Sequence, residues 1–458
     1  MSDLAAQSEA QRPRWQAAIF NRRMLACVFT GLASGMPLFL LIQMVPVWLR
    51  EEGVSLQDIG LLALVQLPYT WKFLWAPLLD RFSLPGLPRR QDWIFALQLC
   101  LAGVIAAIGW YQPAGGLFEI TVCAVLIGFF SASLDIQIDA YRRELLPEHE
   151  LGLGNSIHVQ AYRLAGLIPG SLGLILAGYM PWAQAFLVMA GFMAAGAIVS
   201  LWVPRLGAVT ARPLTLRASF VDPFRDFIHR KGYGGLALIL AFIVLYKLGD
   251  NMATALSSAL YVDLGFTSQE IGLVAKNAAL WPAIIGALLG GLIMLRLGIN
   301  RALWLFGLVQ LLTIFGFVWL STTYADRVVL ALVVGAEYLG VGLGTAAFVA
   351  FMARETNPAL AATQLALLTA LAAVPRVLAN SITGFLVSGT EQAEGLSGVA
   401  ATVAGALDGL GFPAAGLGWT GFFYLCAGLA IPGMLLLVWV APFNAPGSIP
   451  EHDTETPA

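Results

Sequence analysis

The chain has 458 residues, of which 59% are apolar and only 11% are charged. Soluble globular proteins carry about 25% charged residues, so this composition excludes a water-soluble enzyme and a disordered protein. A net charge of −2 offers no basic field for nucleic acid. The four cysteines are scattered through apolar stretches, without the spacing of a disulfide framework or a metal site. We therefore expect an integral membrane protein that needs no metal and no cofactor.

A membrane-spanning helix needs about 20 consecutive, mostly apolar residues. Twelve stretches of the chain meet this requirement, and they do not alternate as the strands of a β-barrel would. The predicted spans are approximately 24–48, 57–79, 92–111, 118–140, 153–179, 183–203, 236–261, 270–295, 302–320, 328–352, 360–388 and 416–441. The sequence thus predicts an all-α membrane protein with twelve transmembrane helices.

The positive charges predict how these spans are oriented. Lys and Arg are enriched in the cytoplasmic loops of membrane proteins. When the N-terminus is placed in the cytoplasm, most Lys and Arg residues outside the spans fall in cytoplasmic loops, and only Arg50 and Arg327 fall in the opposite loops. We therefore expect both termini to be cytoplasmic.

A repeat divides the chain into two halves. Gly265 lies 212 residues after Gly53, and Gly272 lies 212 residues after Gly60. In both copies a short loop that contains the first glycine leads through a polar cap into a span that starts with Ile-Gly-Leu, which contains the second. Two parallel six-helix bundles with a long basic connection are typical of the major facilitator superfamily. The predicted divisions are a cytoplasmic N-terminal tail (1–23), an N-terminal six-helix bundle (24–203), a cytoplasmic linker (204–235), a C-terminal six-helix bundle (236–441) with a periplasmic, partly helical loop (389–415), and a cytoplasmic C-terminal tail (442–458).

The loop between the second and third predicted spans has an acidic residue followed by basic ones. This pattern resembles the inside-loop signature of the superfamily, in which the loop latches the two halves in the outward-facing state. The candidate gating residues are Asp80, Arg81, Arg89 and Arg90. The alternative is that these charges only anchor the loop on the cytoplasmic side.

Two acidic residues lie in the fourth predicted span. A charged side chain inside a membrane usually faces a cavity or a partner, because exposure to lipid costs a few kcal/mol. Asp135 and Asp139 are spaced i,i+4 and share one helix face. Asp135 is the deeper one and is expected to take part in proton coupling, whereas Asp139 either does so or forms a solvated ion pair with Arg142 or Arg143.

Arg163 and Arg376 are predicted near mid-depth of the fifth and eleventh spans. Each needs an acid or an anionic ligand, and Glu337 in the tenth span is the acid expected in the second half. Burial favours the protonated form of a carboxyl group, and a nearby arginine favours the ionised form. A substrate that displaces the arginine would therefore drive proton uptake. The alternative is a structural bridge between Glu337 and Arg376.

Further ionisable residues lie within the spans. Lys72 and Lys247 are candidates for binding an anionic solute. Lys247 and Asp250 are spaced i,i+3, so either they neutralise each other or Asp250 takes part in proton coupling. Lys276 lies near the outside end of its span and is expected to extend toward the membrane surface.

Five longer strings resemble the AmpG family of muropeptide permeases. They are LPYTWKFLWAPLLDR (67–81), DIQIDAYR (135–142), YKLGD (246–250), GTAAFVAFM (344–352) and the stretch from ATQ at 362–364 to Arg376. The resemblance extends from about residue 24 to 388. It implies a proton-driven importer, not an enzyme, in the inner membrane of a Gram-negative bacterium, working by alternating access.

The resemblance also implies the cargo, which in this family is GlcNAc-1,6-anhydro-MurNAc peptides released by cell-wall turnover. Import then feeds peptidoglycan recycling and the induction of β-lactamase. In such a site, cations would meet the carboxylates and aromatic rings would face the sugars. The substrate-binding candidates are Arg163, Arg376, Lys72, Lys247, Tyr69, Gln137, Tyr162 and Gln364, and the proton-coupling candidates are Asp135, Asp139, Glu337 and Asp250. The expected partners are the muropeptide, protons and the lipid bilayer, and the expected state is a monomer.

Other functions are compatible with parts of this pattern. AmpG-like permeases of the same fold carry siderophores, and related chains carry acetyl-CoA. A membrane-embedded enzyme would need a nucleophile–base pair or a metal-binding cluster, which the sequence does not present. A sensor that does not transport would show no substrate-dependent proton flux.

Overall fold

The computed structural model describes residues 21–81, 89–147, 150–204, 222–323, 325–356, 368, 373–390 and 397–443. Within these ranges the regular secondary structure is helical and contains no strand. Nine of the described helices are long and apolar enough to cross a membrane. This confirms the predicted all-α membrane fold.

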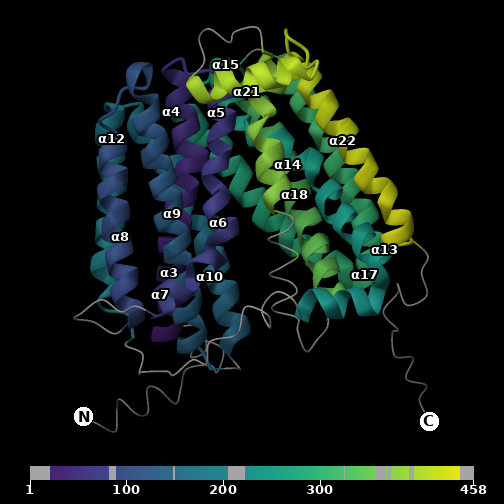
Figure 1. Ribbon diagram of the computed structural model, residues 1–458, viewed down its shortest axis with the longest axis horizontal. Coiled ribbons are helices and arrows are strands. Elements are labelled where there is room, and N and C mark those ends of the chain that lie inside the picture. The colour runs from purple at the N-terminus through teal and green to yellow at the C-terminus, as the bar shows by residue number, and fades with distance from the viewer. Residues whose placement is uncertain are drawn as a thin grey trace.

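The described residues 21–204, which we call the first half, form six helical columns. Three of these columns contain more than one helical element, and the other three are single helices (Figure 1). The elements are α3 (Arg22–Phe39), η1 (Leu40–Met44), α4 (Val45–Glu51), α5 (Leu56–Leu61), η2 (Leu62–Gln66), α6 (Leu67–Trp71), η3 (Lys72–Leu74), α7 (Ala76–Arg81), α8 (Arg89–Ile108), α9 (Pro113–Leu145), α10 (Leu151–Ala165), η5 (Ile168–Gly173), α11 (Leu174–Ala177) and α12 (Trp182–Ser200).

The second column, from α5 to α7, is divided into short α-helical and 3₁₀ pieces and is not among the nine long helices. Pro68 lies at the start of α6, directly after the 3₁₀ turn η2. A proline has no amide hydrogen to continue a helical ladder, so the interruption follows from the sequence. The predicted span 57–79 is therefore present as an interrupted helix.

The described residues 222–443 form the second half. Its elements are α13 (Asp222–Tyr246), α14 (Leu248–Ala255), α15 (Ser257–Asp263), α16 (Ser268–Glu270), η7 (Ile271–Ala275), α17 (Lys276–Ser321), α18 (Arg327–Glu355), a helical stretch at 373–381, α20 (Thr383–Ser388), α21 (Gly398–Gly409) and α22 (Gly418–Val440). Helix α13 starts inside the predicted linker, and Gly232, with a φ of 70° and a ψ of 172°, divides it into a first segment within the linker and a second segment that leads into the predicted span 236–261.

Gly298 divides the long element α17 into two columns. Its φ of 72° and ψ of 167° reverse the chain between the predicted spans 270–295 and 302–320, and this left-handed φ favours glycine. The nine long helices thus contain ten of the twelve predicted spans. The other two are the interrupted column 57–79 and the span 360–388, of which the structure describes only part. The helix count is consistent with twelve.

The repeat detected in the sequence has the same backbone structure in both halves. Gly53 and Gly265 have φ values of 81° and 89°, which end the preceding helix in the left-handed conformation that favours glycine. Two residues later, Ser55 and Thr267 each cap the next helix by accepting a hydrogen bond from a backbone amide, that of Asp58 and that of Glu270. We call the end of the molecule that holds both turns the Glu51 side, and the opposite end the Arg22 side.

The two halves pack together most closely on the Glu51 side, where α4 meets α15, α5 meets α20 and α11 meets α16. In Figure 1 the two groups of helices converge at the top, near α15 and α21, and diverge toward the bottom. Glycine makes the close approach possible: a Cβ added at Gly384 would lie 1.9 Å from the carbonyl oxygen of Leu56, and one at Gly272 would lie 2.8 Å from that of Ser171.

Polar contacts hold the same junction together. Arg50 pairs with Asp263 across the halves. The side-chain amide of Gln57 donates to the carbonyl of Gly389 at 2.9 Å, and the Ser397 hydroxyl donates to Asp58. Ser397 caps α21, a helix of 12 residues that lies within the predicted loop 389–415 and is too short to span a membrane.

We predict that Gly384→Ala destabilises the protein, because the new methyl group would collide with the α5 backbone. Overpacking of this kind costs roughly 1–3 kcal/mol, so the melting temperature in detergent should fall by several degrees. The control is Gly191→Ala on α12, where an added Cβ meets nothing within 4 Å. Equal melting temperatures for the two variants would contradict the close contact between α5 and α20.

Candidate functional site

A cavity of about 380 Å³ lies between the two halves, just below the junction on the Glu51 side. Small-molecule sites typically measure roughly 300–1,000 Å³. The first half contributes residues of α3, η1, η2 and α10, including Phe39, Gln43, Gln66 and Arg163. The second half contributes α14, α15, α17, α18 and the 373–381 helix. Because both halves form its wall, a relative movement of the halves would change the access to this cavity.

Irregular helical turns border the cavity. Gln43 belongs to the π-helical turn η1, and Ala275 ends the π-helical turn η7. Such turns are rare and occur frequently at functional sites, since they leave backbone groups outside the regular hydrogen-bond ladder. The two turns lie in separate halves of the molecule, on opposite walls of the cavity.

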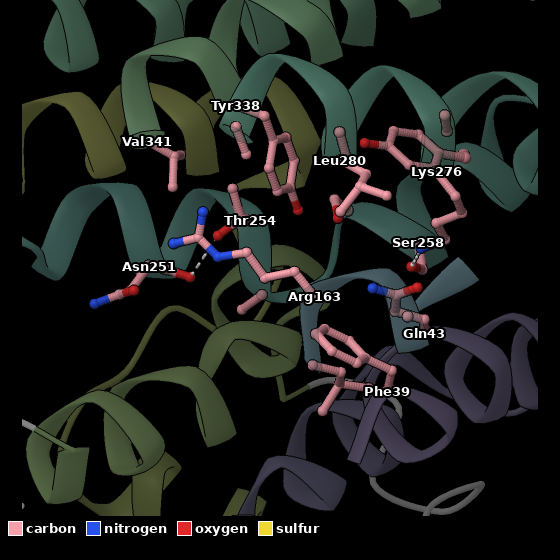
Figure 2. A pocket seen from close by; sticks show the side chains of 18 of the residues that line it. Phe39, Gln43, Arg163, Asn251, Thr254, Ser258, Lys276, Leu280, Tyr338 and Val341 are labelled. Carbon is pink, nitrogen blue, oxygen red and sulfur yellow. Dashed lines mark hydrogen bonds between the residues drawn. The ribbon is translucent and has the colours of Figure 1, made fainter. Parts of the chain in front are cut away.

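The cavity is lined by three cationic side chains. They are Arg163 of α10, Lys276 of α17 and Arg376 of the 373–381 helix, and no Asp or Glu is present among the described residues that line it. Neutral polar groups complete the wall, including those of Asn251 and Tyr338. Figure 2 shows Arg163 extending toward Asn251 in the opposite half. The cavity therefore combines net positive charge with many hydrogen-bonding groups.

A second cavity of about 480 Å³ adjoins the first within the second half. The two share a wall that includes Asn251, Thr254 and Arg376. The second cavity adds Lys247 and Asp250, which form an ion pair at 2.8 Å. This pair confirms that the i,i+3 spacing brings the two charges together, and Arg376 lies where the two cavities meet.

Glu337 is fully buried beside this ion pair. The charged groups that act on it most strongly are Asp250 and Lys247. The Thr313 hydroxyl and the Asp250 carboxyl are its polar neighbours, and no described donor meets its two oxygens or Asp250 Oδ1 with full hydrogen-bond geometry. The predicted alternative of a Glu337–Arg376 bridge is wrong, since no such ion pair is present in the described part of the chain. Arg376 instead faces the cavities.

A separate charge cluster lies in the first half. Lys72 Nζ is 3.9 Å from Asp135 and 3.6 Å from Asp139, and Arg142 pairs with Asp139 at 2.9 Å. The Ser34 hydroxyl donates to Asp135 at 2.5 Å. The ion pair expected between Asp139 and Arg142 is thus present, and Lys72 joins both acids. None of these residues lines either cavity.

The structure places the remaining predicted residues elsewhere. Tyr162 packs against Phe39 with ring centroids 5.3 Å apart, and neither Tyr162 nor Tyr69 lines the two cavities. Gln137 is fully buried and accepts a hydrogen bond from Arg90 at 3.1 Å, while Arg90 also pairs with Glu144 of α9.

Four predicted residues cannot be placed by their side chains. Gln364 lies outside the described residues. Asp80 and Arg81 end α7 and Arg89 begins α8, and the structure describes only their backbone.

Sequence reasoning missed Lys276 as a cavity residue. We expected it to extend toward the membrane surface, but it is only 8% exposed and donates to the Ser258 hydroxyl at 2.7 Å. Asn251, Thr254 and Tyr338 were also missed. Asn251 and Thr254 lie on α14 and Tyr338 lies on α18, and the placement of these two helices around the cavity leaves no spacing signal in the sequence.

Comparison with known proteins agrees with this architecture. Residues 24–380 match the family model of the Major Facilitator Superfamily. The chain is 46% identical to an uncharacterized protein of Haemophilus influenzae, covering 93% of this chain and 96% of that protein. It is 36% identical to the anhydromuropeptide permease of Escherichia coli K12, covering 91% and 79% of the two chains.

Solved structures share the fold at low sequence identity. The crystal structure of the nucleoside transporter NupG aligns with a TM-score of 0.64 at 12% identity over 90% of this chain and 98% of that one. Together with the matches above, this assigns the family: the chain is a multi-pass inner-membrane transporter that belongs to the major facilitator superfamily and, within it, to the AmpG family.

Proposed function

We propose that this protein imports anhydro-muropeptides from the periplasm to the cytoplasm by alternating access, driven by protons. The imported GlcNAc-1,6-anhydro-MurNAc peptides would supply peptidoglycan recycling and the induction of β-lactamase. The permease of Escherichia coli, 36% identical, supports the cargo class. The partners are the muropeptide, protons and the surrounding lipid, and the protein acts as a monomer.

The cationic cavity is the observation that carries this proposal. A muropeptide presents carboxylates on its peptide and hydroxyls and amides on its sugars. Arg163, Arg376 and Lys276 supply positive charge without a competing acid on the described cavity wall. A guanidinium group binds a carboxylate in a bidentate geometry, so the two arginines fit such a cargo better than a neutral sugar.

We predict that Arg163→Ala and Arg376→Ala each reduce the uptake of labelled anhydro-muropeptide about 10-fold or more. A hydrogen bond to a charged group contributes about 1.5–3 kcal/mol, and each variant removes at least one such bond. The measurement is uptake into cells with equal amounts of each variant in the membrane. Arg296→Ala is the control, because that exposed arginine lines neither cavity. Parental uptake by both cavity variants would contradict the proposed site.

The proposed orientation of the chain indicates which state of the transport cycle the structure represents. With both termini in the cytoplasm, the Glu51 side is periplasmic. The halves are joined on that side by the Arg50–Asp263 pair and by the glycine contacts of α5 with α20. The structure then corresponds to a carrier closed toward the periplasm.

We predict that alkaline phosphatase is active when fused after Gly411 and inactive when fused after Phe443. This enzyme needs disulfides, which form in the periplasm and not in the cytoplasm. Gly411 follows α21 on the Glu51 side and Phe443 follows α22 on the Arg22 side. Green fluorescent protein at the same two positions serves as the control and should give the opposite pattern. Phosphatase activity at Phe443 would contradict the orientation.

The proton is carried, in this proposal, by the second-half group of Glu337 and Asp250. Two neighbouring buried carboxyls are costly in an apolar interior unless a proton or water satisfies their oxygens. Lys247 neutralises one of the two charges through its pair with Asp250. Asp135 and Asp139, held by Lys72 and Arg142, form the second candidate group.

We predict that Glu337→Gln abolishes accumulation driven by an acidic exterior but leaves exchange of labelled for unlabelled cargo intact. The amide keeps the shape of the side chain and cannot bind or release a proton. Both quantities are measured in proteoliposomes. Glu119→Gln, at an exposed position of α9, is the matched control and should accumulate like the parent. Proton-driven accumulation by the Glu337 variant would remove this residue from the coupling mechanism.

A further inference from the structure

Lys276 lines the cavity but is not among the substrate-binding residues predicted from the sequence. Its side chain is 8% exposed, and its ammonium group donates to the Ser258 hydroxyl at 2.7 Å. No acidic residue lines the cavity that it faces, among the residues that the structure describes. A lysine ammonium has three donors, and one neutral hydroxyl neither uses them all nor offsets the charge.

The position of Lys276 differs from that of the arginines. Figure 2 shows Lys276 beside Ser258 and near Gln43, away from the Asn251 and Val341 end of the cavity. Asn251 and Val341 belong to the wall shared with the second cavity, and Lys276 does not. Lys276 therefore lies at the end of the cavity that is remote from this shared wall.

The helix registers give the same result. Lys276 is eight residues from Ser268, where its helix begins on the Glu51 side. Arg376 lies in the 373–381 stretch, twelve residues before Ser388, which is the last residue of the following helix α20 on that side. At a rise of about 1.5 Å per residue, the two positions differ in depth by roughly 6 Å. The two cations therefore start from different depths of the cavity wall, so that two carboxylates of one cargo can each meet one of them.

We propose that Lys276 binds the terminal carboxylate of the cargo's peptide, while Arg163 and Arg376 bind a second acidic group nearer the Arg22 side. This inference rests on the proposed function and deepens it. Lys276 is then a residue that determines specificity: it selects cargo whose peptide ends in a free carboxylate. Ser258 holds the ammonium group in place until the carboxylate arrives.

The test compares two ligands that differ only in this group. The ligands are GlcNAc-1,6-anhydro-MurNAc-tripeptide and the same compound with its terminal carboxylate amidated, and binding is measured with the purified full-length protein in nanodiscs. The parent should bind the free acid about 10-fold more tightly than the amide, as expected for a lost charge-assisted bond. Lys276→Gln should bind both ligands equally, with the parental affinity for the amide. Lys276→Met keeps most of the length of the side chain without its charge, and it is the second variant for the same binding measurement. It should also bind the two ligands equally.

The controls separate the possible failures. Lys231 lies on the Arg22 side and pairs with Glu355. The control variant Lys231→Gln should therefore keep the parental preference for the free acid over the amide. If the variants at position 276 keep the preference for the free acid, the role of Lys276 is overturned while the proposed function stands. If the parent binds neither ligand, the proposed function fails and this inference fails with it. Melting temperatures in the same nanodiscs verify that each variant is folded.

Discussion

A charge that leaves water needs a partner, and this requirement organises the interior of the protein. The first half satisfies it internally, because Lys72 and Arg142 lie against Asp135 and Asp139. The second half satisfies it in part, through the ion pair of Lys247 and Asp250. The cavity between the halves has cations and no acid on its described wall. This imbalance favours an anionic solute, and it is the physical basis of the proposed binding site.

The second constraint is close contact between helices that must also separate. Gly384 and Gly272 bring backbone against backbone across the halves, within an apolar cluster to which both halves contribute buried side chains. Small residues permit such close approach in membranes, where apolar burial gives little net attraction between helices. The Arg50–Asp263 pair adds a polar contact on the same side. A junction of this kind closes tightly on one side of the membrane, which suits a carrier that opens to each side in turn.

The fold could be predicted from the sequence because its signals are local. Span lengths and the turns at Gly53 and Gly265 each depend on a few neighbouring residues, and the 212-residue repeat is recognised by comparing two such short stretches. The site was only partly predictable. Mid-depth arginines can be recognised from their position in a span, and Arg163 and Arg376 both line the cavity. Whether Glu337 would face Arg376 or Asp250 depends on the rotation of three helices, which no spacing encodes. Lys276 was misplaced for a similar reason: a lysine near a helix end usually extends outward, but Ser258 on a neighbouring helix holds this one inside.

The short helix α21 lies across the junction rather than along either bundle. Its cap residue Ser397 is bonded to Asp58 of the first half, while its apolar face packs on Phe385 of the second half and on Leu61 of the first. The two halves can therefore separate on the Glu51 side only if α21 loses its contacts with one of them. A molecule that clamped α21 onto α5 would arrest the transporter from its surface, without entering the cavity or competing with the cargo, and would act as a non-competitive inhibitor.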